Sequence, residues 1–120
     1  MSSKVFLGYS PQDRKHINKA LAFLEKRGMV NRGSEEISDT IEHLAEGASF
    51  RDGIRATISS ANKVVLLWTQ AAAESQYVNY EAGMADALGK PMIIVIPDKS
   101  APEVPENLSD AKIVRLGEDG

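Results

Sequence analysis

Two uninterrupted apolar runs constrain the fold of this chain more than any other feature. They are residues 64–68 (VVLLW) and residues 92–96 (MIIVI). Strands without polar alternation are buried on both faces, which is typical of a parallel sheet covered by helices. The segment between the runs contains a helical pattern over residues 75–90, and parallel strands need such a crossover. The runs therefore predict interior strands of an α/β domain.

Three weaker segments complete the expected sheet. Residues 4–9 (KVFLGY) are rich in strand formers, and residues 112–116 (KIVRL) indicate a short last strand. Residues 35–39 are so polar that a strand there belongs at a sheet edge. We therefore expect a flavodoxin-like doubly wound sheet of five parallel strands, in the order 2-1-3-4-5, with helices on both faces. A chain of 120 residues is long enough for one such domain, residues 1–120.

Capping signals mark three helices. Ser10 begins the first, and Gly28 ends it. The S-x-x-D box at residues 49–52 begins the second, which runs to about residue 61. Ser75 begins the third, and Gly89 ends it. Alternating strands and capped helices agree with the α/β class.

The third helix carries a carboxylate within its apolar stripe. The stripe consists of Tyr77, Val78, Met84, Ala85 and Leu88. Glu81 lies in the middle of it, where an ionised group is costly unless it is paired or used. Two interpretations stay open: Glu81 pairs with a buried arginine or caps a loop amide, or Glu81 belongs to a functional site.

The expected fold places this helix beside a ligand crevice. In a doubly wound sheet of this order, the crevice lies beyond the carboxyl ends of strands 1 and 3. These strands are expected to end at Tyr9-Ser10 and at Trp68-Thr69. The helix that begins at residue 75 follows soon after, so Tyr77 and Glu81 can face the crevice.

Missing motifs exclude several functions. The chain has no G-x-x-x-x-G-K-[ST] or G-x-G-x-x-G phosphate loop. It lacks the acidic strand ends of a phospho-receiver and the Ser/Thr/Gly-rich loop of a flavodoxin. There is no cysteine, no histidine pair with metal-ligand spacing, and no serine with a suitably placed histidine. We therefore expect neither a metal site nor a nucleophilic triad.

Charge and hydropathy narrow the expected partners and location. The net charge of −3 offers no general attraction to nucleic acid or to anionic lipid. No apolar run is long enough for a membrane span, and the first residues are too polar for a signal peptide. We expect a soluble cytoplasmic protein with no nucleic-acid or membrane partner.

A lone carboxylate with aromatic neighbours suits one chemistry. The neighbours are Tyr9, Trp68 and Tyr77. Cleavage of the N-glycosidic bond of NAD⁺ releases nicotinamide without general-acid help, and one carboxylate can stabilise the oxocarbenium-like ribose. Aromatic rings could stack on nicotinamide. The alternative, that these aromatic residues belong to the core, stays open.

The chain resembles a TIR (Toll/interleukin-1 receptor) domain over nearly its whole length. Residues 4–13 (KVFLGYSPQD) are similar to the family's first motif, F-I-S-Y-S-x-x-D, at the end of the first strand. Residues 39–58 resemble the acidic loop ending in glycine and the I-x-x-x-I helix that follow the second strand. Ser75-x-Tyr77-x-x-x-Glu81 matches the S-x-W-x-x-x-E pattern of TIR domains that hydrolyse NAD⁺.

The resemblance implies roles for particular residues. Glu81 would be the catalytic carboxylate, with Tyr77 in place of the usual tryptophan as a smaller stacking surface. The other candidates for substrate contact are Tyr9, Ser10, Leu44, Gly47, Phe50, Trp68 and Ser75. NAD⁺ would be the substrate, and no cofactor or metal is expected.

Assembly and chain length also follow from the resemblance. The loop of residues 44–50 would contact other TIR domains, so a neighbouring subunit could complete the site in a homo-oligomer. The chain ends soon after its expected fifth strand, without the family's last helix. It would therefore be either a fragment of a longer protein or a minimal TIR domain.

Three functions remain under consideration. The first is an NAD⁺ glycohydrolase that yields nicotinamide and linear or cyclic ADP-ribose, acting in immune defence or toxicity. The second is a non-enzymatic TIR scaffold that signals through TIR–TIR contacts. The third is an enzyme like the nucleoside deoxyribosyltransferases. Glu81 together with Tyr77 favours the first, because a pure adaptor needs no carboxylate in the crevice.

Overall fold

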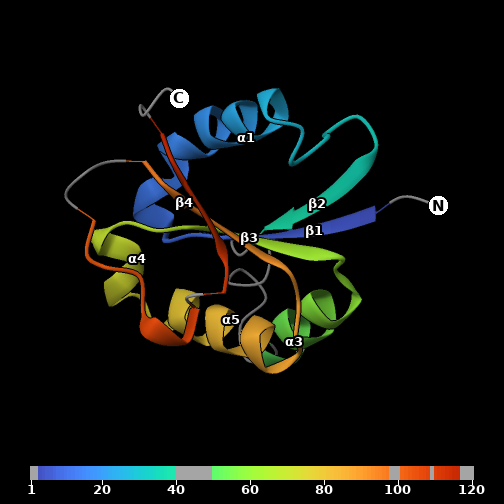
Figure 1. Ribbon diagram of the computed structural model, residues 1–120. Helices are drawn as coiled ribbons and strands as arrows, with labels where there is room; N and C mark the ends of the chain where they lie inside the picture. The colour runs from blue at the N-terminus through green and yellow to red at the C-terminus, as the bar shows by residue number, and fades with distance from the viewer. Residues whose placement is uncertain (1–2, 40–49, 98–100, 109, 117–120) are drawn as a thin grey trace.

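A parallel β-sheet forms the centre of the molecule in a computed structural model that describes residues 3–39, 50–97, 101–108 and 110–116 (Figure 1). Its strands are β1 (Ser3–Gly8), β2 (Glu35–Asp39), β3 (Lys63–Leu67), β4 (Met92–Ile96) and β5 (Lys112–Arg115). The strand order is β2-β1-β3-β4-β5, and every neighbouring pair is parallel. The predicted fold class is thereby confirmed.

The two apolar runs are adjacent interior strands, as their composition predicts. β3 pairs with β4 so that Val65 is opposite Ile93. On its other side β3 pairs with β1, and Gly8 is opposite Leu66. The polar strand β2 lies at the edge of the sheet next to β1.

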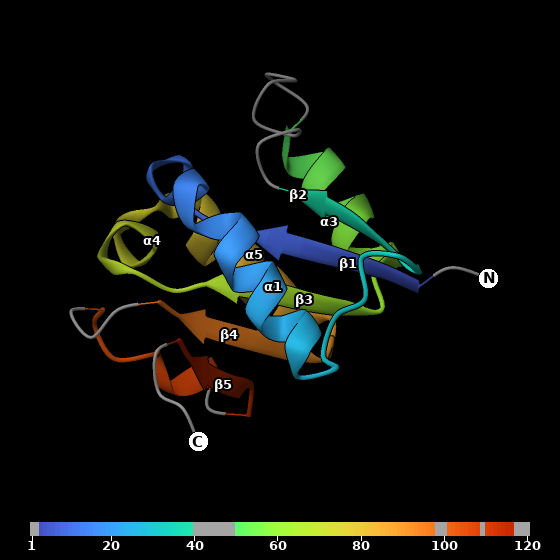
Figure 2. The ribbon, with the colours of Figure 1, turned by 90° about the horizontal axis from the view of Figure 1, so that it is seen from above.

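Helices cover both faces of this sheet. They are η1 (Pro11–His16), α1 (Ile17–Lys26), α3 (Phe50–Ser60), α4 (Gln70–Glu74), α5 (Gln76–Ala87) and η3 (Glu106–Leu108). In Figure 1, α1 lies above the sheet and α3 and α5 lie below it. Seen from above, α1 crosses over the middle strands (Figure 2).

Each face of the sheet has its own core. The α1 face buries Val5, Leu7, Tyr9, Ala20, Leu21, Leu24, Val30, Val65, Leu67, Ile93, Val95 and Val114. The α5 face buries Phe6, Ile54, Ile58, Ala61, Val64, Leu66, Trp68, Ala72, Val78, Ala82, Ala85, Ile94, Ile96 and Leu108. Odd-numbered β1 residues point to the α1 face and even-numbered ones to the α5 face, because strand side chains alternate.

The first predicted helix begins after Ser10 and ends near Gly28, as predicted, but its first part, η1, is not an α-helix. The Ser10 hydroxyl accepts a hydrogen bond from the Gln12 N–H (3.4 Å), and the Asp13 N–H donates to the Ser10 carbonyl (2.8 Å). That short-range bond makes η1 a 3₁₀ helix, which is frequent at helix N-termini. At the far end, Gly28 adopts a positive φ of 72°, and the Met29 N–H donates a hydrogen bond to the Leu24 carbonyl (2.9 Å).

Two details differ from the sequence prediction. The helix α4 was not expected; the Thr69 hydroxyl caps it by accepting from the Ala72 N–H (3.0 Å). Leu88 was expected in the buried stripe of the third helix but is 42% exposed, because it follows Ala87, the last residue of α5. Ala82 takes a place in that buried face instead.

No helix within the described ranges is long and apolar enough to cross a membrane. Residues 40–49, which include the Ser49 cap and most of the loop of residues 44–50, lie outside the described residues.

Candidate active site

The helix α5 positions the central residue of the candidate site. The Ser75 hydroxyl accepts a hydrogen bond from the Val78 N–H (3.3 Å), and its carbonyl accepts from the Asn79 side chain (2.8 Å). Gly89 ends the helix with a positive φ of 67°. These caps were predicted from the sequence, and they fix where the helix begins and ends.

The face of α5 that packs on the sheet contains a carboxylate. Val78, Glu81, Ala82 and Ala85 are its buried residues. Glu81 is 0% exposed, although glutamate is almost never fully buried in proteins without a specific reason. The position of Glu81 is therefore the most informative feature of this helix.

The Glu81 carboxylate lies directly against the end of β1. A Cβ atom added to Gly8, the last residue of β1, would be 2.7 Å from Glu81 Oε1. It would also be 2.7 Å from Leu66 Cδ2. The fold thus brings the carboxylate to the carboxyl end of the first strand, where a doubly wound sheet binds its ligands. Sequence reasoning did not include Gly8 in the site.

Tyr77 and Ser75 lie on the same helix as Glu81 or at its start. Tyr77 precedes Glu81 by four residues, so the two side chains lie on neighbouring turns. Both Tyr77 and Ser75 are half-buried. Ser75 contributes through the cap that begins α5. Of the three aromatic neighbours predicted for the carboxylate, Tyr77 is the one on the same helix.

Tyr9 and Trp68 do not converge on one side of the sheet. Tyr9 is 2% exposed and packs in the α1-face core, so the sheet separates it from Glu81. Trp68 is also 2% exposed but packs in the α5-face core. Its indole N–H donates to the Pro102 carbonyl (3.0 Å). Both rings contribute to the packed core in the described structure.

A buried polar pair joins the ends of β1 and β3. The Thr69 hydroxyl donates to Asp13 Oδ2 (2.5 Å), and each residue is 7% exposed. Ser10, a predicted site residue, is the buried cap of η1 beside this pair. Asp13 was not among the predicted site residues, although its place in the motif of residues 4–13 was an available signal.

The predicted loop contacts are not placed. Leu44 and Gly47 lie outside the described residues. Phe50 is the first residue of α3. Their roles in substrate contact stay predictions.

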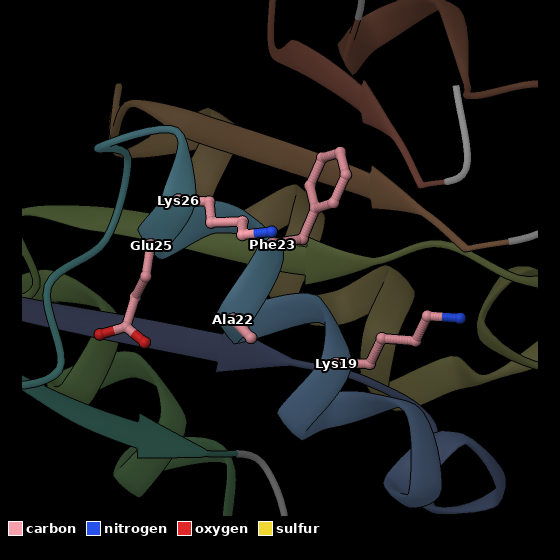
Figure 3. A pocket seen from close by; sticks show the side chains of 5 residues that line it. All are labelled: Lys19, Ala22, Phe23, Glu25 and Lys26. Carbon is pink, nitrogen blue, oxygen red and sulfur yellow. The ribbon is translucent and has the colours of Figure 1, made fainter. Parts of the chain in front are cut away.

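The described residues contain no group of three or more His, Cys, Asp or Glu side chains that could hold a metal ion. A hollow of about 530 Å³ lies on α1 and is lined by Lys19, Ala22, Phe23, Glu25 and Lys26 (Figure 3). Because α1 covers the opposite face of the sheet from α5, this hollow is separate from Glu81.

Comparison with known proteins defines the class. The family model described as "TIR domain" matches residues 5–119. The chain therefore belongs to the TIR domain family. No curated protein sequence matches the chain closely enough to count as a relative.

Solved structures share the fold at low sequence identity. The TIR domain of the Toll-related receptor TRR-2 from Hydra magnipapillata is 19% identical, with a TM-score of 0.69 over 93% of this chain and 82% of that one. The CMP N-glycosidase BcmB from Clostridium botulinum is 19% identical, with a TM-score of 0.54 over 95% and 88%. A 2-desoxiribosyltransferase from Leishmania mexicana is 16% identical, with a TM-score of 0.55 over 80% and 65%.

Proposed function

We propose that this TIR domain hydrolyses the bond between nicotinamide and ribose in NAD⁺, with Glu81 as the catalytic carboxylate. The observation that carries the proposal is the position of Glu81, fully buried and against Gly8 at the carboxyl end of β1. Buried carboxylates in ligand crevices are functional candidates because desolvation makes them costly to retain. The products would be nicotinamide and ADP-ribose or its cyclic form.

The fold neighbours support this class of chemistry. One is named a CMP N-glycosidase and another a desoxiribosyltransferase. The same sheet architecture therefore carries sugar-transfer enzymes in other organisms. Fold alone does not define a substrate, so NAD⁺ rests on the Ser75-x-Tyr77-x-x-x-Glu81 pattern.

The proposed reaction needs few protein groups. The bond between the ribose carbon and the nicotinamide nitrogen breaks, and its electron pair neutralises the positive charge of the nicotinamide ring. The ionised Glu81 stabilises the ribosyl cation that remains. Water then adds to that carbon and releases a proton. The overall reaction converts NAD⁺ and water to nicotinamide, ADP-ribose and a proton.

Tyr77 would contribute binding rather than chemistry. It is half-buried and lies one turn before Glu81. A ring at that place can stack on the nicotinamide and hold the scissile bond near the carboxylate. The short cap at Ser75 keeps this part of α5 in position.

The burial of Glu81 bears on how the site is opened. A side chain with 0% exposure meets a substrate only after the groups that cover it move. TIR domains generally assemble with other TIR domains, and we propose that assembly of several copies opens or completes this site. The physiological setting would be immune defence or toxicity.

A substrate panel tests the proposal. Concentrated protein is incubated in parallel with NAD⁺, with CMP and with a deoxynucleoside plus a free acceptor base, and the products are separated by chromatography. We expect nicotinamide and ADP-ribose, linear or cyclic, from NAD⁺ alone. Base transfer from the deoxynucleoside would instead support the deoxyribosyltransferase alternative. No turnover of any substrate under assembling conditions would favour the scaffold.

A further inference from the structure

Gly8 stands at a position where the backbone does not require glycine. Its φ lies outside the left-handed region, unlike those of Gly28 and Gly89. Glycine in a strand costs stability, because it increases the entropy of the unfolded chain and packs no side chain. The physical reason for glycine at this position must therefore lie in the space next to its Cα atom.

That space is occupied by the Glu81 carboxylate. The Cβ of any other residue at position 8 would lie 2.7 Å from Glu81 Oε1, which is far inside ordinary packing distance. On the other side it would lie 2.7 Å from Leu66 Cδ2, whose residue pairs with Gly8 across β1 and β3. Leu66 and Glu81 are both 0% exposed, so neither can move aside into solvent.

We propose that Gly8 is a positioning residue for the Glu81 carboxylate. Its missing side chain leaves the slot at the carboxyl end of β1 in which the carboxylate lies. The inference rests on the proposed function, since positioning affects turnover only if Glu81 faces the ribose. A displacement of a catalytic group by about 1 Å can cost roughly 100-fold in rate. The side chain at position 8 therefore determines whether the carboxylate can reach the reacting carbon.

The first test compares two glycine-to-alanine variants. Gly8→Ala should lower kcat for NAD⁺ by about 100-fold with a much smaller change in KM, because the carboxylate is displaced while the substrate contacts remain. Gly83→Ala is the matched control: it lies on the exposed side of α5, and its added Cβ would have no atom within 4 Å. Gly83→Ala should keep wild-type turnover. Wild-type kcat in Gly8→Ala would overturn the inference.

The second test asks whether Gly8 acts through Glu81. Aspartate is one methylene shorter, so in a Glu81→Asp background the carboxylate no longer reaches the added Cβ. Gly8→Ala should then reduce the residual turnover by well under tenfold, compared with about 100-fold in the wild-type background. An equal loss in both backgrounds would show that position 8 affects the enzyme independently of the carboxylate, and would overturn the inference.

A third readout requires no substrate and separates the two proposals. Leu66→Val removes the Cδ2 atom, which is the other atom that a Cβ at position 8 would meet at 2.7 Å. All variants are therefore also made in the Leu66→Val background, so that this second clash does not unfold them. There, Gly8→Ala should lower Tm by roughly 4 °C or more with Glu81 present, and by clearly less in the Glu81→Asp variant. Equal Tm shifts would overturn the inference. If wild-type protein cleaves no NAD⁺, the proposed function fails, while these shifts still test the slot.

Discussion

At the scale of single residues, the central feature is the fully buried Glu81. Its helix packs on the sheet mainly with small side chains, Ala82 and Ala85, which let the backbone of α5 approach closely. The close approach and the absent side chain at Gly8 together bring the carboxylate to the strand end. A structural carboxylate and a catalytic one differ in what the protein loses when the charge alone is removed.

Glu81→Gln tests that difference. The substitution keeps the shape and removes the charge, so the protein should stay folded and melt at or slightly above the wild-type temperature. NAD⁺ cleavage should fall by at least about 100-fold, because a neutral amide loses about 3 kcal/mol or more of stabilisation of the ribosyl cation. Turnover and thermal melting are measured on the same preparation. A much lower melting temperature would identify Glu81 as a structural ion-pair partner, and unchanged turnover would exclude catalysis by it.

At the scale of elements, a buried polar contact joins the segments that follow β1 and β3, in addition to the apolar cores. Thr69 lies just after β3. Its hydroxyl caps α4 and also donates a hydrogen bond to Asp13 in η1, the helix that follows β1, so Thr69 connects β3, α4 and η1. A second contact closes the turn after α1: Arg32 makes hydrogen bonds and an ion pair with Glu25. The first is buried and the second exposed, so they should differ in strength.

Thr69→Val should destabilise the fold by about 2–4 kcal/mol, since it removes a helix cap and a buried hydrogen bond to a carboxylate. Valine preserves the branched shape, so packing changes little. Thr69→Ser retains the hydroxyl and should cost less than about 1 kcal/mol. Denaturant unfolding at neutral pH measures both variants. If Thr69→Val were as stable as wild type, the bond to Asp13 would not hold the strand ends together.

The contact between Glu25 and Arg32 predicts a pH dependence. The hydrogen bonds from Arg32 lower the pKa of Glu25 below its usual value of 4.5. Because the pKa is lowered in the folded state, the stabilisation is present above about pH 4.5 and is lost as the pH falls through the lower, folded value. Arg32→Ala should therefore be less stable than wild type at pH 7 and equally stable in strong acid. Unfolding curves at several pH values measure this, and a constant difference would contradict it.

At the scale of the whole molecule, the domain places its candidate site at the carboxyl edge of a five-stranded sheet and shields the catalytic candidate from solvent. A TIR domain that needs neighbouring copies should show this in its kinetics. Specific activity with NAD⁺ should rise with protein concentration and with crowding agents, since both favour assembly. Activity is measured over a wide concentration range beside light scattering. Substantial activity that does not change with concentration would indicate a self-sufficient monomer.

Local signals were sufficient to predict most of the architecture. The bounds of β4 and both ends of α5 follow from an unbroken apolar run and from Ser75 and Gly89, which act through their immediate neighbours. The strand order followed from the crossover pattern, because few topologies connect buried parallel strands. Glu81 was identifiable because a charged residue is unusual on the apolar face of an amphipathic helix.

The tertiary structure decided which side chains meet. Tyr9 and Trp68 both end apolar strands, yet the pleat and the register of β1 against β3 send them to opposite faces of the sheet. Gly8 and Glu81 are far apart in the chain, and only the packing of α5 on β1 brings them together. The sequence by itself determined the strands, the three main helices, the strand order and the unusual carboxylate, because caps and periodicity are local. The slot for that carboxylate depends on contacts between distant segments, and only the assembled fold determines it.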